Sequence, residues 1–541
     1  MVPHVFCSSV FRRLIGCQLA IALAAGLPAA RVEAAGYICA EGGGGLAKGH
    51  WADGVFHWMI EHGGDRRVIV IGYHADPDKT VERVFIKAGA TAVDHLVIAD
   101  RATADSAETG NALIAADIIW IRGGDQSKYV KQWRGTRTEA AIRAVYARGG
   151  VIGGTSAGAA VLGEVIYDAF NGSLTSTEAL SNAYHPIVTL TSDFLQLTPG
   201  VLFDTHFTER GRLGRLAVML ARRHADAQQD LIGAGLDYRT ALCVYPDLTA
   251  EVRGEGSVTI LHRTPESQET VAQGRPAVVT DLAYTQLTEG YRYDLKNRRV
   301  LGRPDSAELV TPGANQRRFY ACTLDGADVN SSLFGQWVLT GIDQRAALFN
   351  GRIGLDEGAG ALTQTLVVAR VLADDGFVEN RVGGSQWVIA KNPGAMAVLM
   401  TEDIVVESSP PAVLAFTGKA TSSGSVMILD GAGMTSAAFS TYRNDDSSGG
   451  PRQSVAIENA RLHLLSNGHF YDANRRVALL LRPSADLTAD GTIDRSDIHA
   501  FSEFLTGVRA ASWQARSIDA NQDGRLDRED IAPFVAAALG E

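Results

Sequence analysis

The sequence has few cysteines, a deficit of positive charge and no long apolar run beyond an N-terminal segment that ends at Ala34. Its 541 residues include five Cys, 50 Lys plus Arg and 61 Asp plus Glu, so the formal net charge is −11. Five Cys are too few for a scaffold that depends on many disulfides. The acidic balance argues against a protein that binds nucleic acid through a basic surface. After Ala34 no stretch is apolar for long enough to cross a bilayer.

Glycine and proline are also too few and too irregularly spaced for a fibrous protein, at 57 and 16 residues. Hydrophobic residues make up 46% of the chain and charged residues 21%, which is a globular balance with enough apolar material for large cores. This composition excludes a largely disordered chain. The length predicts three or four domains of roughly 150 residues, or two large domains and a small one.

The N-terminus has the composition of a targeting segment. Arg12 and Arg13 precede a mostly apolar stretch over residues 14–30, and a small–x–small cleavage pattern ends at Ala34. We interpret residues 1–34 as a secretory signal peptide, with an N-terminal membrane anchor as the alternative. A signal peptide predicts that the mature protein is extracellular or periplasmic.

The next part of the chain alternates between apolar and amphipathic stretches. This alternation over residues 36–245 predicts a parallel sheet with helices on both faces, whereas short alternating runs after Leu242 predict antiparallel strands. The fold class that we expect is therefore α/β, with a doubly wound, mostly parallel sheet. The strands expected in it include 67–73 and 117–122, and the helices include 80–90 and 139–148.

Residues 317–480 look like a degenerate copy of the preceding part. We interpret them as a second α/β-β lobe that is not catalytic, because Gly358 takes the place of the serine discussed below and Gly376 takes the place of the histidine. Four short motifs recur in the same order: 121–126 in 338–344, 155–159 in 357–361, 207–214 in 377–383, and 290–300 in 468–477.

A candidate nucleophile lies at Ser156. The apolar run that starts at Val151 leads into a Gly-x-Ser-x-Gly sequence, and small residues there allow a sharp turn from strand to helix that exposes the serine hydroxyl. The same turn would aim the backbone N–H of Ala157 at the oxygen of an attacked carbonyl. The alternative is a glycine-rich turn that only packs against a helix.

A serine hydroxyl needs a base, and His206 is the candidate. It follows a strand-like run over residues 201–205, and residues at the carboxyl ends of strands in α/β proteins often form sites. Three arginines follow, at Arg210, Arg212 and Arg215. Because cations oppose the dipole at the start of a helix, their presence indicates that they meet an anion. The alternatives are a structural histidine and a solvated helix start.

Together these motifs resemble the cyanophycinase and dipeptidase E family of serine peptidases, over residues 36–300. The matching runs are Gly123-Gly-Asp-Gln126, Gly154-Thr-Ser-Ala-Gly-Ala159 and Asp204-x-His-Phe-x-x-Arg-x-Arg-x-x-Arg215. The resemblance implies that Ser156 is the nucleophile and His206 the general base. It also implies an oxyanion hole formed by the N–H groups of Gly124 and Ala157. The substrate-binding residues that it implies are Gln126, Thr205, Arg210, Arg212 and Arg215.

The implied reaction is exopeptidase cleavage of β-Asp-Arg dipeptides from a poly-aspartate backbone that carries arginines, as in cyanophycin. A peptide bond next to a free carboxylate calls for a cationic partner beside the nucleophile, and arginine binds carboxylates through two parallel hydrogen bonds. The alternatives are a related isoaspartyl dipeptidase and a catalytically impaired binding protein of the same fold.

The sequence departs from the family pattern at two positions. Thr205 stands where the family usually has Gln, and Tyr238 stands where it has the Glu that orients the histidine. Asp237 is the nearest acid and our candidate for the third member of the triad, with Asp168 and Glu178 as rivals. Loss of the orienting acid can reduce the rate by several powers of ten.

The C-terminal segment, residues 484–541, contains two loops with the spacing of calcium ligands. Oxygen-bearing side chains occupy positions 1, 3, 5, 9 and 12 of each loop, with Gly at position 6, and a helix-like stretch follows each loop. An acidic surface tail is the alternative. The ligands expected are Asp486, Thr488, Asp490, Thr492, Asp494 and Asp497 in the first loop, and Asp519, Asn521, Asp523, Arg525, Asp527 and Asp530 in the second.

Asp at the twelfth position and the separation of the loop starts, Asp486 and Asp519, make this segment similar to a dockerin module. The resemblance implies a small all-α module that binds two Ca²⁺ ions and a cohesin-type protein partner outside the cell. The proposed peptidase chemistry itself requires no cofactor. The sequence leaves the oligomeric state open.

Overall fold

The computed structural model describes most of the N-terminal part of the chain and separate segments of the rest. The described residues are 36–44, 51–309, 319–320, 344–349, 352–357, 365–368, 386, 389–390, 394, 396–400, 404–409, 413–418, 424–442, 452–479, 495–506, 528, 531–532 and 534–535. The expected signal peptide lies outside them. Among the described helices, none combines the length and the apolar character that a bilayer crossing needs.

The first large sheet has nine strands in the order β16-β15-β11-β10-β1-β5-β4-β2-β3. The five strands from β1 to β3 in this order are parallel, and the other four are antiparallel. The parallel strands are β1 (Tyr37–Glu41), β2 (Arg67–Gly72), β3 (Ala92–Val97), β4 (Ile118–Ile121) and β5 (Val151–Thr155). The antiparallel strands are β10 (Thr240–Val244), β11 (Thr249–Gly254), β15 (Arg292–Asp294) and β16 (Arg299–Gly302).

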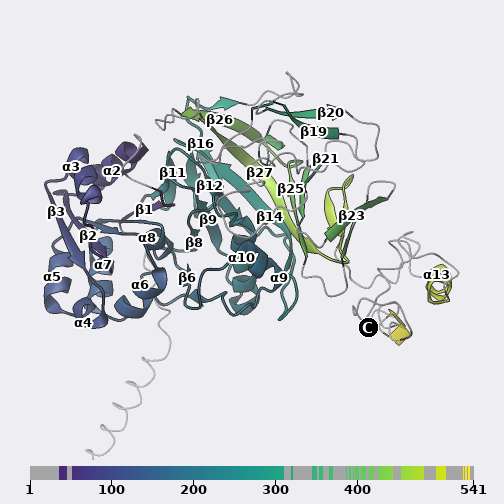
Figure 1. The fold of residues 1–541 in the computed structure, drawn as a ribbon, viewed down its shortest axis with the longest axis horizontal. Coiled ribbons are helices and arrows are strands. Elements are labelled where there is room, and N and C mark those ends of the chain that lie inside the picture. Colours follow the sequence, from purple (N-terminus) through teal and green to yellow (C-terminus); the bar gives the residue numbers. More distant parts are fainter. Residues whose placement is uncertain are drawn as a thin grey trace, which may run out of the picture.

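Helices cover both faces of the parallel strands, as the alternation in the sequence predicts (Figure 1). Side chains that alternate along each strand enter opposite cores: Val70 and Trp120 pack with α2 and α3, whereas Ile71 and Ile121 pack with α5, α6 and α7. The helices are α2 (Trp51–His62), α3 (Thr80–Ala88), α4 (Arg101–Ala104), α5 (Ala107–Ile114), α6 (Gln126–Trp133), α7 (Arg137–Ala147) and α8 (Ala157–Ala160).

The second large sheet joins distant parts of the sequence. Its main path is β21-β22-β25-β27-β14-β12-β9-β8, so that β14 of the N-terminal part pairs with β27 of the following part (Figure 1). Helices α9 (Ser176–Ser181) and α10 (Leu213–Ala227) contribute to its core. The strands are β8 (Val201–Asp204), β9 (Ile232–Leu236), β12 (Val258–His262), β14 (Val278–Leu287), β21 (Thr365–Val368), β22 (Met396–Met400), β25 (Ser425–Asp430) and β27 (Arg452–Ser466).

Shorter strands complete the description. The strands β13 (Glu269–Thr270), β17 (Glu308–Leu309) and β26 (Ser436–Tyr442) attach to the second sheet. A separate four-stranded sheet contains β23 (Ile404–Ser409), β24 (Val413–Gly418), β28 (Phe470–Asp472) and β29 (Val477–Leu479). A small pair is formed by β6 (Ile166–Tyr167) and β7 (Leu190–Thr191).

One of the sequence matches between the two halves is wrong. Thr155 ends the parallel strand β5, but its expected counterpart Glu357 ends β20 (Arg352–Glu357), which pairs antiparallel with β19 (Gln344–Phe349) and β18 (Phe319–Tyr320). The short Gly-Ala pattern that the two segments share therefore does not reflect a common structure. Gly358 and Gly376 lie outside the described residues.

The C-terminal segment contains α13 (Arg495–Leu505) and further helical residues at 531–532 and 534–535. The rings of Phe501 and Phe534 stack with their centroids 4.0 Å apart, so the two helical regions that follow the expected loops are in contact. Of the twelve expected calcium ligands, Asp497 lies in the first turn of α13, and the others lie outside the described residues.

Candidate active site

Ser156 is the single residue between a strand and a helix. β5 ends at Thr155 and α8 begins at Ala157, and the backbone of Ser156 adopts φ 54° and ψ −119°. A positive φ is unfavourable for a residue with a side chain, so the surrounding structure must hold it. The Ser156 N–H donates to the carbonyl of Glu41 at 2.9 Å, which ties the turn to β1.

The two glycines of the Gly-x-Ser-x-Gly sequence are steric requirements of this turn. A Cβ atom on Gly154 would lie 2.5 Å from the carbonyl group of Gly158, and one on Gly158 would overlap the carbonyl oxygen of Ile121 on β4. The turn is thus packed so closely on itself and on the sheet that only glycine fits at either position. This is the arrangement that presents a serine hydroxyl beyond the end of a strand.

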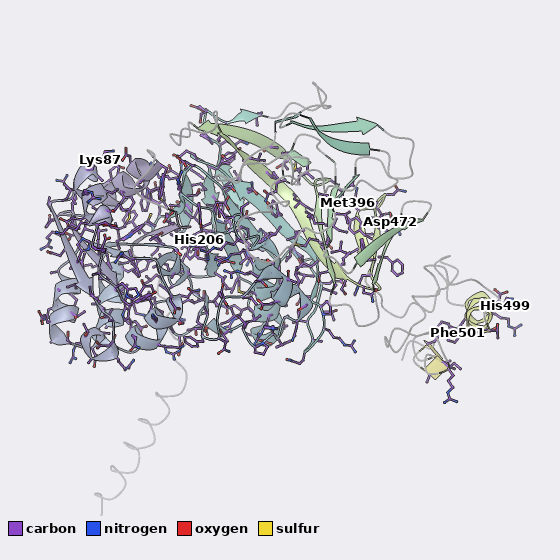
Figure 2. The ribbon with its side chains drawn as sticks, in the orientation of Figure 1. Lys87, His206, Met396, Asp472, His499 and Phe501 are labelled. Atoms are coloured by element: carbon purple, nitrogen blue, oxygen red, sulfur yellow. The ribbon has the colours of Figure 1, made fainter. Side chains whose placement is uncertain are left out.

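His206 comes to Ser156 from the other sheet. It follows β8 and is labelled in Figure 2. Its Nε2 lies 2.5 Å from the Oγ of Ser156, within hydrogen-bond distance. Its backbone N–H donates to the carbonyl of Gly42 at 2.8 Å. Glu41, the last residue of β1, and Gly42, the first residue after it, therefore accept hydrogen bonds from the candidate nucleophile and from the candidate base.

The imidazole is held by packing on two sides. A Cβ on Gly43 would overlap the ring, and the Tyr238 ring contacts it nearly edge-on with a centroid separation of 4.8 Å. His206 is only 9% exposed, and its Nδ1 is buried with no hydrogen-bond partner among the described residues. The orientation of the ring thus depends on its neighbours and not on a carboxylate bound to Nδ1.

The surroundings of His206 keep its imidazole neutral. Burial, followed by the nearby charges of Arg210, Arg212 and Arg215, lowers the pKa of His206 from 6.5 to about 2. A general base must be unprotonated to accept a proton from a serine hydroxyl. The arginines therefore support the base form of His206 in addition to any contact with substrate.

The two residues expected to form an oxyanion hole, Gly124 and Ala157, lie in segments next to Ser156. Ala157 is the first residue of α8, and such a residue has no acceptor within its own helix. Gly124 lies in the loop after β4 with φ 139°, a conformation that suits glycine. A Cβ on the preceding Gly123 would lie 3.3 Å from the Cβ of Ser156, so this loop passes directly beside the nucleophile.

The arginine trio divides into buried and exposed members. Arg215 is 2% exposed, donates from Nε to Asp204 at 2.8 Å and also bonds the other oxygen of that carboxylate. Arg212 donates to the carbonyl of Thr205 at 2.6 Å, and burial and Arg215 lower its pKa to about 9. Arg210 is exposed. The expectation that Arg215 binds substrate is wrong, because its guanidinium is buried and bonds both oxygens of Asp204, the last residue of β8.

Asp237 does not orient His206. It is 1% exposed, and its Oδ1 accepts the N–H of Thr208 at 3.0 Å. Its Oδ2 accepts the N–H of Ser257 at 3.1 Å and the Oγ–H of Ser257 at 2.6 Å. The prediction that Asp237 is the third triad member is therefore wrong: its carboxylate joins two turns.

The two rival acids are also occupied elsewhere. Asp168 accepts hydrogen bonds from the N–H of Phe170 and from the hydroxyls of Thr189 and Thr191. Glu178 closes a capping box with Thr175 at the start of α9. Each of these carboxylates stabilises local backbone, and the contacts described for them are with residues outside the catalytic pair.

Comparison with known proteins places this site in a family. The model of peptidase family S51 matches residues 70–247. The cyanophycinase of Synechococcus elongatus is 33% identical over 221 residues, which span 40% of this chain and 65% of that protein. The cyanophycinase of Trichormus variabilis is 32% identical over 224 residues, which span 40% of this chain and 70% of that protein. The chain belongs to peptidase family S51.

The S51 match covers Gly124, Ser156 and His206 and begins after the segment Glu41–Gly43. The chain spans 65% of the length of the Synechococcus relative. Among solved structures, a peptidase from an acI-B1 Actinobacterium aligns with 48% of this chain and 98% of its own, at 19% identity and a TM-score of 0.35.

The remaining residues expected in the S51 site are partly engaged. Gln126, at the start of α6, donates from Nε2 to the carbonyl of Tyr167 at 3.2 Å and is half-buried. Thr205 is buried, and its N–H donates to Asp204 at 2.9 Å. Gln126 is close in sequence to Gly124, and Thr205 directly precedes His206. Because Gln126 is only half-buried whereas Thr205 is buried, Gln126 is more accessible to a ligand than Thr205.

The loop after β1 is a part of the site that the sequence interpretation missed. Glu41 at the end of β1 and Gly42 in this loop accept hydrogen bonds from Ser156 and His206, and Gly43 lies against the imidazole. Its signal in the sequence is the run of glycines at 42–45, directly after the first strand. A glycine run at a strand end indicates close approach of backbone to another group.

The lowered pKa of His206 predicts the pH dependence of activity. The base is neutral above its pKa, so activity should be retained as the pH falls through 6.5 and be lost only at a clearly lower pH. The acid limb of kcat/KM measures this ionisation in the free enzyme. A limb at pH 6.5 or above would contradict the described environment of the imidazole.

A carboxylate placed at position 238 should raise the rate. In Tyr238→Glu the new side chain can accept a hydrogen bond from Nδ1–H of His206 and stabilise the imidazolium. We expect kcat to rise by at least about tenfold, a conservative share of what an orienting acid contributes in related triads. Tyr238→Gln is the control with the same shape but no charge. Equal kcat values for the two variants would exclude this role for a charge at position 238.

Proposed function

We propose that this chain is a secreted serine exopeptidase that cleaves aspartyl peptides in a reaction of the cyanophycinase type. The observation that carries the proposal is the 2.5 Å approach of Ser156 Oγ to the Nε2 of a buried His206, at a strained turn. A neutral imidazole in contact with a serine hydroxyl at the end of a strand is the arrangement that nucleophilic catalysis by serine requires.

In the proposed reaction Ser156 attacks the carbonyl carbon of the substrate while the Nε2 of His206 takes the hydroxyl proton. The N–H groups of Gly124 and Ala157 stabilise the negative charge on the former carbonyl oxygen. His206 then donates the proton to the leaving amine, and an acyl-enzyme remains. A water molecule, deprotonated by the same imidazole, hydrolyses the acyl-enzyme and restores the serine.

The charges around the pair favour an anionic substrate. The charges of three arginines act on His206, and one carboxylate, Asp204, bonds the two buried arginines, so these four side chains together carry an excess of positive charge. Arg210 is the exposed member and our choice for contact with a substrate carboxylate. In the cyanophycin polymer each arginine is linked through its amino group to an aspartate side chain and keeps a free carboxylate, so anionic groups lie near the backbone bond that is cleaved. The relatives named above as cyanophycinases support this substrate class.

The proposed catalytic unit is a Ser–His pair oriented by packing. The carbonyl of Gly42 bonds the backbone of His206, and Gly43 and the ring of Tyr238 pack against the imidazole. In a triad a carboxylate would orient the imidazole. Such a pair should work more slowly than a full triad. Tyr238 is also the observation that favours the second candidate, a binding protein that keeps the aspartyl-peptide site without turnover.

Incubation with cyanophycin and, separately, with β-aspartyl dipeptides tests the proposal. We expect β-Asp-Arg to be released from the polymer by the wild-type chain and not by Ser156→Ala, because the variant lacks the attacking oxygen. Its unfolding temperature should stay close to that of the wild type. Release at the same rate by both proteins would contradict the assignment of Ser156.

The same assay separates the candidate functions. Hydrolysis of free β-aspartyl dipeptides without release from the polymer would favour an isoaspartyl dipeptidase. Binding of the polymer by both proteins, with no product from either, would favour the binding protein. In that case Tyr238→Glu should be assayed next, since it restores the kind of acid that the family pattern contains.

We further propose that residues 484–541 form a dockerin-like module that binds two Ca²⁺ ions and tethers the enzyme to a cohesin-type protein. The support is the spacing of the two loops in the sequence and the contact of Phe501 with Phe534, which joins the helical regions that follow them. Four carboxylates in each loop would repel one another in the absence of a cation, so the fold of this segment should depend on the metal.

Calcium titration of the full chain checks the module. Calorimetry should detect two bound Ca²⁺ ions, and the double variant Asp486→Ala/Asp519→Ala should lose both because it removes the first ligand of each loop. Peptidase activity should be the same in EDTA as in calcium. Absence of binding by the wild type would leave an acidic tail instead of a dockerin-like module.

A further inference from the structure

The second large sheet consists of two halves with the same strand arrangement. One half is β8-β9-β12-β14 and the other is β21-β22-β25-β27. In each half the two outer strands are parallel and the following pairs are antiparallel. The halves meet at the antiparallel pair β14–β27, where the sheet continues without interruption.

The strand registers of the two halves also agree. Val201 is opposite Ile232 in β8–β9, and Thr365 is opposite Met396 in β21–β22. The difference in residue number between Val201 and Thr365 is the same as that between Ile232 and Met396. The two paired residues are therefore separated by the same number of residues in β8–β9 as in β21–β22. We call the difference in residue number between Val201 and Thr365 the first shift. Adding the first shift to the residue numbers of β8 gives those of β21, and adding it to the first residue of β9 gives the first residue of β22.

The first shift extends to a pair of strands in the neighbouring sheets. In β10–β11 Thr240 is opposite Gly254, and in β23–β24 Ile404 is opposite Gly418. The first shift takes Thr240 to Ile404 and Gly254 to Gly418. The order and the register of four successive strands are therefore repeated later in the chain.

Unusual backbone conformations recur at a second constant displacement. Asp281 and Asn459 have φ of 56° and 63°. The shift in residue number between them, the second shift, also takes Arg298 to Arg476, with φ of 55° and 58°. It takes Gly290 to Gly468 as well, with φ of 80° and 87°. The second shift likewise relates β14, β15 and β16 to β27, β28 and β29, and the last of the four sequence matches, 290–300 with 468–477, lies in this region.

The pairing of β14 with β27 is symmetric: exchanging each residue for its counterpart in the other strand leaves the set of pairs unchanged. Under the second shift, Val279 corresponds to Ile457 and Gln286 to Leu464. Val279 pairs with Leu464, and Gln286 pairs with Ile457. Replacing each residue of one pair by its counterpart therefore gives the other pair. The same holds for Leu282–Leu462 and Tyr284–Ala460, while Ala283 pairs with its own counterpart Arg461. A local two-fold axis therefore passes through the Ala283–Arg461 pair.

Contacts across this axis resemble those of a permanent interface. Leu282, Tyr284 and Leu462 lie in a single buried core. Gln286 donates from Nε2 to the carbonyl of Val455 at 2.8 Å, and the N–H of Asp281 donates to His463 Nδ1 at 3.2 Å. Buried apolar contacts with satisfied polar groups are typical of obligate interfaces, which resemble a protein core.

We propose that residues 365–479 are a second copy of the part of the peptidase unit between β8 and β16, and that this copy occupies the place of a second subunit within one chain. A self-complementary pairing about a two-fold axis is the geometry of a symmetric dimer interface. Figure 2 labels Met396 and Asp472 in this copy, on the far side of the joint from His206.

The register corrects the sequence alignment of this region. By the first shift, the sequence position that corresponds to His206 is Arg370, which lies outside the described residues, whereas the motif match assigned Gly376. Because position 370 holds an arginine, the copy has no histidine where the base would stand. Among the described residues the repeated strands begin with β21, the counterpart of β8, and none of them corresponds to β5.

The physical role of the copy is to cover the edge of β14. Without β27, β14 would be the edge strand of its half of the sheet. Its unpaired backbone groups could then pair with a strand of another molecule. Here β27 fills that edge and removes the surface through which two such chains would associate.

The mass and integrity of the full chain test this proposal. Light scattering after size exclusion should give the mass of one chain, 57.6 kDa less any leader that has been removed. A protease site inserted between residues 309 and 319 should allow cleavage, and the two fragments should remain together as one particle of unchanged mass. A dimeric mass, or separation of the fragments without denaturant, would overturn the proposal.

A cross-link tests the position of the axis. In the cleaved chain, the double variant Ala283→Cys/Arg461→Cys should join the two fragments under mild oxidation, since these residues are directly opposite. Ala283→Cys/Ala456→Cys is the matched control, with the second cysteine further along the same strand, and the cleaved wild type reports on the native cysteines. Equal cross-linking in the control would overturn the assigned register.

Discussion

The site depends on one constraint, the backbone of Glu41 and Gly42 between the two large sheets. These residues accept the N–H groups of Ser156 and His206, which follow strands of different sheets. The Ser156 turn has an unfavourable backbone conformation, and neither sheet alone could bring the hydroxyl to the imidazole. Because the loop touches the imidazole through Gly43, any added side chain there would displace the base.

Charge around the site is arranged by the same residues that build it. Arg215 and Asp204 form a buried pair at the end of β8, close to His206 in the chain. This pair fixes the strand end, while Arg212 and Arg210 add positive charge that helps to keep the imidazole neutral. The arginine motif therefore has two functions that the sequence alone does not separate: two arginines support the structure, and the exposed one remains for an anionic ligand.

The joint between β14 and β27 gives the second part of the chain a structural role. A single core contains residues from both sides of the joint, so the peptidase-like part and the copy contribute to the same apolar cluster. A core shared in this way links the stability of α10, which follows the arginine motif, to strands that come much later in the sequence. The cost is a long sequence separation between partners, which slows folding relative to local pairing.

The sequence by itself determined the turn at Ser156, the helices on both faces of parallel strands and the pairing of Ser156 with His206, because these follow from local sterics, periodicity and a family motif. It misplaced the third acid: Asp237 follows a strand next to Tyr238, but its carboxylate turns to Thr208 and Ser257. It also placed the counterpart of β5 at Glu357, where the strand is antiparallel. Only the tertiary structure decided the partner of Arg215, the role of the loop at Gly43 and the two-fold pairing at Ala283, because each depends on groups that are distant in sequence and meet only when the sheets are assembled.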